Sequence, residues 1–340
     1  MTDPSDQNPA WVQEQTSEYA VELYQGKRDS GAHFSVPETR FNHTPGLGRL
    51  FRSTTFSISD IKAIKNSVPG TTVNDAMVCL IAGALNKYLS HHGELPDTSL
   101  GAIMPKNIRS LSNANDKSGN QVGGLFADIH TNIEDPIERM AAIHGSVEKS
   151  KQFSKDINSD AIFPYLMGGF LSPRLGKAIA KYTQEFHLME RIGPAIMNTL
   201  ITNVPGPNFP LYHAGAEMVS YCGIPPLTDG VGLGHAVYSY NGTISLATIT
   251  CPSIMNNPDF YLQCCRESYE ELLGAALAIK QKTSDKGHKL DDSKKTALSD
   301  KKEAPGKNKK TTKRKPRAAS DGNAIPIGKK SDSKQPTAIS

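Results

Sequence analysis

Asn74 and Asp75 are the residues whose types and placement most readily suggest chemistry. The amide and the carboxylate are adjacent, and they stand at the start of residues 71–89, the longest uninterrupted apolar segment of the chain. Thr72 is typical of an N-cap, with Asp75 three positions later, so one interpretation is a simple helix start signal. In the other, a buried helix delivers both groups to the mouth of a cleft. Spacing alone favours capping, because capping sequences are common.

The segment that positions this pair is predicted to be a helix of the core. Val73, Ala76, Leu80 and Ala84 recur at helical spacing, and other apolar residues fill most of the remaining circumference. A helix that is apolar nearly all round belongs in a protein interior. The run is too short to span a bilayer, which needs about 20 apolar residues.

Metal, disulfide and dinucleotide chemistry have no support in the sequence. The five cysteines are odd in number and form no CxxC motif, so we expect neither a disulfide framework nor a zinc site, and a reducing compartment fits. Neither GxGxxG nor GxxxxGK[ST] occurs. We therefore expect no metal and no bound cofactor. The cysteines are Cys79, Cys222, Cys251, Cys264 and Cys265.

Charge is distributed unevenly along the chain. Residues 281–340 hold 17 Lys and Arg against 7 Asp and Glu, whereas the preceding residues hold 21 against 27. The basic segment has few large apolar residues, so we predict a disordered tail. It either binds an anionic membrane surface or is merely solvated. Nucleic acid is the less favoured partner, because no aromatic residue interleaves the charges of 307–320.

The first residues do not resemble a secretory signal, since no basic patch followed by an apolar run occurs there. We expect a cytoplasmic protein, with attachment to the periphery of the inner membrane as the alternative. Residues 1–37 are predicted to be a linker or the remnant of a preceding domain, and 38–280 a single domain.

Within that domain, helices and strands interleave without the regular alternation of a doubly wound fold. Asn241-Gly242 between two alternating runs predicts a hairpin, hence antiparallel pairing. We predict an α/β fold with a mixed sheet and helices. The expected helices are 11–24, 59–67, 71–89, 136–153, broken helical structure over 158–194, and 258–280; the expected strands are 49–57, 100–104, 122–132, 196–203, 218–222, 235–240 and 243–249.

Seven strings, in this order, resemble the bacterial wax ester synthase/diacylglycerol acyltransferase (WS/DGAT) family. The resemblance extends over nearly the whole of residues 38–278. The strings are ETRFN (38–42), GTTVNDAMVCLIAGALNKYL (70–89), IMPKNIR (103–109), GNQVGGLFADI (119–129), EDPIERMAAIHGS (134–146), ITNVPGPNFPLYHAGAEM (201–218) and GLGHAVYSYNGTISLATI (232–249).

The resemblance implies the C-terminal half of a CoA-dependent acyltransferase-like two-domain fold, with a substrate tunnel between the halves. It implies transfer of an acyl group from acyl-CoA, as substrate, to the hydroxyl of a diacylglycerol or long-chain alcohol. By position, Asn74 and Asp75 match one of the family's functional motifs, so the resemblance favours a supporting catalytic role for both. A separate N-terminal half is then an expected partner.

The resemblance also implies a general base that this sequence lacks, namely the second histidine of HHxxxDG in the family's N-terminal half. His91 and His92 continue with Gly-Glu-Leu-Pro-Asp, and we predict that they are exposed loop residues. Structural roles are expected for His130, His213 and His235. We therefore expect little activity from this chain alone and no histidine of this chain beside Asn74 and Asp75.

A non-catalytic lipid- or membrane-binding protein is the alternative from a different class. In that case apolar residues 161–171 and the basic tail would dock on a membrane or lipid-droplet surface.

Overall fold

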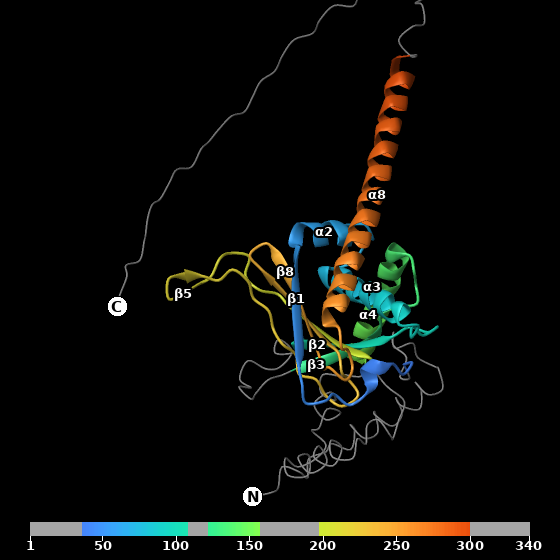
Figure 1. The fold of residues 1–340 in the computed structure, drawn as a ribbon. Coiled ribbons are helices and arrows are strands. Elements are labelled where there is room, and N and C mark those ends of the chain that lie inside the picture. Colours follow the sequence, from blue (N-terminus) through green and yellow to red (C-terminus); the bar gives the residue numbers. More distant parts are fainter. Residues whose placement is uncertain (1–35, 108–121, 157–196, 300–340) are drawn as a thin grey trace, which may run out of the picture. The chain divides into compact units, whose positions relative to one another are not determined.

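The computed structural model describes residues 36–107, 122–156 and 197–299 (Figure 1). The chain divides into Met1–Gly287, which holds the sheet, and His288–Ser340, of which only the end of one helix is described. The elements in order are η2 (Arg40–Asn42), β1 (Leu50–Ser57), α2 (Ile58–Asn66), α3 (Val73–His91), β2 (Gly101–Asn107), β3 (Val122–Asp128), α4 (Pro136–Asp156), β4 (Thr199–Val204), β5 (Tyr212–His213), β6 (Ala216–Glu217), β7 (Gly234–Tyr240), β8 (Thr243–Thr250) and α8 (Pro258–Ser299).

The main sheet has six strands in the order β1-β8-β7-β4-β2-β3. β2, β4 and β7 run parallel, and the other neighbours are antiparallel. The predicted mixed α/β fold is therefore confirmed. β4 lies between two parallel partners, so its carboxyl end meets the same edge of the sheet as those of β2 and β7.

α3 is the central buried element, as its apolar circumference predicted. Thirteen of its 19 residues are buried, and eleven of these join side chains of the sheet, α4 and α8 in one core cluster. Lys87 of α3 pairs with Glu271 of α8 at 3.2 Å, and the rings of Tyr88 and Tyr261 meet edge to face. Figure 1 shows α3, α4 and α8 lying together against the sheet.

The β7–β8 hairpin turns where its sequence predicted. Asn241 and Gly242 have φ values of 41° and 82°, the left-handed conformation that a two-residue turn of this type requires. Every residue from Gly234 to Tyr240 pairs with β8 in register.

Two predictions are wrong, a strand at 218–222 and the end of the last helix. Residues 218–222 form no strand; Val219 is 87% exposed there, so the apolar residues of this run do not mark a buried face. α8 continues to Ser299 rather than ending near Lys280, so residues 281–299, predicted to be disordered, are helical in the structure. The predictions for 11–24 and 158–194, and most of the basic tail, lie outside the described residues.

Gly83 marks a close crossing of α3 with α4 and α8. A Cβ at Gly83 would lie 2.3 Å from Ser268 Oγ and 2.4 Å from Arg139 Nη1. Arg139 is 2% exposed, and its guanidinium donates to the carbonyls of Ile133 and Glu134, so it has little room to retreat. The glycine is required for packing despite its low helix propensity.

Gly83→Ala is expected to destabilise the protein by about 1–3 kcal/mol, because overpacking outweighs the roughly 1 kcal/mol gained in helix propensity. Gly274→Ala in α8 is the matched control, since a Cβ there meets nothing within 4 Å. It should stabilise by up to about 1 kcal/mol. Urea unfolding midpoints measure both, and equal effects of the two substitutions would contradict the packing described.

Candidate functional site

The first turn of α3 is fixed by a capping box. Thr72 Oγ1 accepts from Asp75 N at 3.2 Å, and the Asp75 carboxylate accepts from Thr72 N at 2.8 Å. The capping interpretation of Asp75 is therefore confirmed as geometry.

Asp75 is fully buried and contacts a histidine from another helix. Its Oδ2 lies 3.0 Å from Nδ1 of His144, which α4 carries and whose side chain is 25% exposed. A carboxylate oxygen only accepts hydrogen bonds, so His144 Nδ1 is the donor in this contact. Asp75 Oδ1 is buried without a hydrogen-bond partner among the described residues.

The contact between Asp75 and His144 contradicts our expectation that no histidine of this chain lies beside the Asn-Asp pair. His144 falls in the apolar stripe of α4 with Met140 and Val147, so the sequence pattern indicated core packing. The one signal in the sequence was a histidine within an otherwise apolar stripe. Nothing in the sequence linked His144 to Asp75, which is 69 positions away.

Gly70 leaves room for the imidazole of His144. A Cβ on Gly70 would lie 3.2 Å from His144 Nε2, and Gly70 has φ +84°, a conformation that other residues rarely adopt. The turn before α3 thus needs glycine for two reasons, its backbone conformation and its closeness to the ring.

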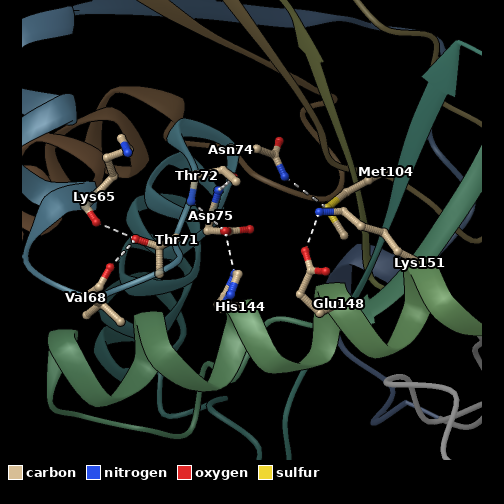
Figure 2. A network of polar contacts seen from close by, with 10 residues as sticks. All are labelled: Lys65, Val68, Thr71, Thr72, Asn74, Asp75, Met104, His144, Glu148 and Lys151. Atoms are coloured by element: carbon tan, nitrogen blue, oxygen red, sulfur yellow. Dashed lines mark hydrogen bonds and ion pairs between the residues drawn. The ribbon is translucent and has the colours of Figure 1, made fainter.

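Asn74 points away from α4, toward the sheet. Its Oδ1 accepts from Nδ2 of Asn203, at the end of β4, at 3.2 Å. Its Nδ2 lies 3.9 Å from the Met104 sulfur of β2, which is a weak acceptor. Figure 2 shows Asn74 on the Met104 side and His144 on the other side of Asp75. Adjacent in sequence, the amide and the carboxylate face different neighbours.

The half-buried amides of Asn74 and Asn203 therefore meet where the start of α3 approaches the carboxyl end of β4. In α/β sheets, ligands commonly bind outside the carboxyl ends of parallel strands. The partial positive charge of a helix N-terminus also favours oxygen atoms that carry or develop negative charge. These features make this corner a candidate ligand site.

His91 and His92 lie at the other end of α3 and are exposed, as predicted. Sixteen residues of helix separate His91 from Asp75, which is about 24 Å at 1.5 Å per residue. His92 Nδ1 lies 2.8 Å from the Tyr88 carbonyl, and the His91 ring packs on Phe260. Neither histidine can reach the Asn-Asp pair.

The contacts of His130 and His235 are those of structural residues. His130 bonds Ser146 at 2.8 Å. His235 is fully buried in β7, where Thr199 and Tyr261 approach its two ring nitrogens at 3.0 and 2.7 Å. Thr199 Oγ1 donates to a carbonyl and so accepts from Nδ1, while Nε2 accepts from Tyr261. A neutral imidazole thus satisfies both contacts.

The buried His235 should make stability depend on pH. Burial lowers the pKa of His235 to about 3, whereas the pKa of histidine in the unfolded chain is about 6.5. Between these two pKa values only the unfolded state takes up the proton. The contribution of His235 to the free energy of unfolding is therefore complete above about pH 6.5 and falls by roughly 2 kcal/mol by about pH 5. It stops falling below about pH 3. Unfolding midpoints from pH 7 to 5 measure this loss.

His235→Gln removes the titrating group and is the control for other ionisable groups. The variant is expected to be less stable at pH 7 but to have a shallower pH dependence. Identical slopes for both proteins would show that His235 is not the source.

No group of three or more His, Cys, Asp or Glu side chains in the described residues is placed to hold a metal ion. The same residues include no helix long and apolar enough to cross a membrane.

Comparison with known proteins identifies a domain. Residues 118–273 match the model of the WS/DGAT C-terminal domain. This part of the chain is a WS/DGAT C-terminal domain. The matched range includes His144 and Asn203 but not Asn74 and Asp75.

Proteins and structures similar to the chain agree with the WS/DGAT assignment. A Mycobacterium tuberculosis protein named as a candidate diacylglycerol O-acyltransferase is 32% identical over 69% of this chain and 45% of its own length. The O-acyltransferase WSD of Acinetobacter baylyi is 28% identical over 66% of this chain and 46% of its own length. The chain thus spans about half the length of these relatives.

A WS/DGAT structure also has the same fold. The wax ester synthase/diacylglycerol acyltransferase of Marinobacter aquaeolei VT8 superposes with a TM-score of 0.53 and 24% identity, over 78% of this chain and 56% of that one. The fold expected from the sequence resemblance is confirmed by this match.

Proposed function

We propose that this chain is the C-terminal half of a neutral-lipid O-acyltransferase. It handles the acyl and acceptor groups, while a complementary N-terminal half supplies the general base. The substrates are acyl-CoA and a diacylglycerol or long-chain alcohol, and the product is a triacylglycerol or wax ester. The observation that carries this proposal is the match of residues 118–273 to the WS/DGAT C-terminal domain.

The chemistry fits the division between the two halves. The base takes the proton from the acceptor hydroxyl as its oxygen attacks the thioester carbonyl carbon. The C–S bond then breaks, and the departing CoA thiolate receives that proton. In this scheme Asn74 and Asp75 have supporting roles: Asn74 faces the reacting groups, and Asp75 holds the first turn of α3 in place.

Exposed apolar residues support the presence of a partner half. Residues 204–224, which we name the apolar arm, carry most of the large hydrophobic side chains that are exposed in the described structure, and β5 and β6 within it pair only with each other there. Such patches usually mark interfaces. Glu217 is the only acidic or basic residue of the arm apart from His213, so the arm suits a protein surface better than an anionic membrane.

Co-expression with the N-terminal half of a WS/DGAT protein, such as that from Marinobacter aquaeolei, tests this proposal. The purified pair should convert acyl-CoA and a diacylglycerol or long-chain alcohol into ester. Phe209→Asp and Tyr212→Asp, at 58% and 63% exposed positions of the arm, should weaken assembly. Leu47→Asp, at a fully exposed position outside the arm, is the control. An assembled pair that forms no ester would contradict the function.

The contact between Asp75 and His144 favours one rival assignment. An imidazole fixed by a carboxylate through Nδ1 resembles a general-base pair, with Nε2 as the proton acceptor. His144 Nε2 lies toward Gly70, however, on the α4 side of Asp75, whereas Asn74 faces the sheet. We therefore assign His144 to the support of Asp75 rather than to proton transfer.

A further inference from the structure

Asn203 comes from a strand face directed at the helices. Alternate residues of β4 share one face, and Ile201, two positions before Asn203, is 1% exposed and belongs to the core cluster with α3. Asn203 continues this face to the end of the strand, where it meets the first turn of α3.

The hydrogen bond between the two amides has a direction. Asn203 Nδ2 donates to Asn74 Oδ1, so the oxygen end of the Asn74 amide is occupied. Its Nδ2 carries two N–H donors, and the partner described for it is the Met104 sulfur at 3.9 Å, a weak acceptor. The Asn74 amide therefore has N–H donor capacity to offer a ligand.

We propose that Asn203 is a positioning residue that orients the Asn74 amide so that its N–H group faces the substrate and donates to the carbonyl oxygen of the acyl thioester. This inference rests on the proposed function. A carbonyl oxygen only accepts hydrogen bonds, so it complements this donor. The start of α3 adds a partial positive charge on the same side. Negative charge that develops on the oxygen during attack would be stabilised by the same N–H group.

The orientation can be tested on the chain as it exists. Asn203→Asp keeps the shape of the side chain but leaves only acceptors, so the Asn74 amide should turn and donate inward. In wild type, the Asn203 side-chain N–H should exchange about fivefold more slowly than that of Asn74. In Asn203→Asp, the Asn74 N–H should become the protected one. Unchanged Asn74 exchange in the variant would overturn the proposed orientation.

The ligand assignment is tested by measuring how tightly two CoA derivatives bind to the assembled pair. Palmitoyl-CoA has the thioester carbonyl, and S-hexadecyl-CoA, a thioether, lacks it. Wild type should bind the thioester about two- to tenfold more tightly, a typical value for one hydrogen bond, and Asn203→Asp should lose the preference. Asn257→Asp adds the same charge at the N-cap of α8, where aspartate also caps well, and should keep the preference.

The outcomes separate this inference from the function on which it rests. Equal binding of thioester and thioether by wild type would overturn the carbonyl assignment while leaving acyl-CoA as a ligand. Failure of the assembled pair to bind either derivative would count against the proposed function and the ligand assignment together. The exchange measurement decides the orientation in both cases.

Discussion

Asp75→Ala is expected to lower the free energy of unfolding by about 2–4 kcal/mol. The capping box contributes about 0.5–2 kcal/mol, and loss of the carboxylate also leaves Thr72 N–H and His144 without their acceptor, at about 1–3 kcal/mol. Asp75 is fully buried, so water cannot replace these contacts without rearrangement. Chemical denaturation followed by circular dichroism measures the loss.

Asp135→Ala is the matched control for Asp75→Ala. Asp135 caps α4 through bonds of 2.8 Å from Ile137 N and Glu138 N, but it is exposed. Its substitution should cost only the capping contribution, about 0.5–2 kcal/mol. In a His144→Ala background, Asp75→Ala should lower the free energy of unfolding by less than it does in wild type, because the contact between the two side chains is already lost. Equal losses of unfolding free energy for the two substitutions would show that Asp75 contributes only as a helix cap.

The chain alone is expected to transfer acyl groups about 100- to 10,000-fold more slowly than the assembled pair, because that is the usual contribution of a positioned general base. The assay uses acyl-CoA with diacylglycerol or a long-chain alcohol, at equal concentrations of folded protein. Release of free CoA and formation of ester are followed together, so that thioester hydrolysis is not mistaken for transfer. Equal rates for the chain and the pair would contradict the division of the enzyme into two halves.

The elements that position the site could be predicted where interactions between residues close in sequence determine their structure. The apolar circumference of α3, the Thr72 cap and the Asn241-Gly242 turn each have a strong local cause, and the structure agrees with all three. The strand predicted for residues 218–222 is wrong because a run of apolar residues forms a buried strand only where a neighbouring strand and a core are present. α8 extended beyond Lys280 because helix propensity persists in a segment too polar to form a core.

The contacts of the site were not predictable from a single sequence. Asn74 and Asp75 were identified as a pair, yet they face different elements, and their partners lie 129 and 69 positions away. In the sequence, Asn203 stands only within the string 201–218 and His144 only within the string 134–146. Such pairings depend on how the helices dock on the sheet, which periodicity does not specify.

The identity of the proton acceptor distinguishes an enzyme whose base lies in the N-terminal half from one whose base lies in this chain. In the assembled pair, acyl transfer is measured after alanine replaces either the second histidine of HHxxxDG in the N-terminal half or His144 of this chain. We expect a loss of about 100- to 10,000-fold for the first variant, while the second retains most activity once corrected for folded protein. Loss of transfer on His144→Ala, with activity retained in the HHxxxDG variant, would contradict this expectation and make this chain the source of the base.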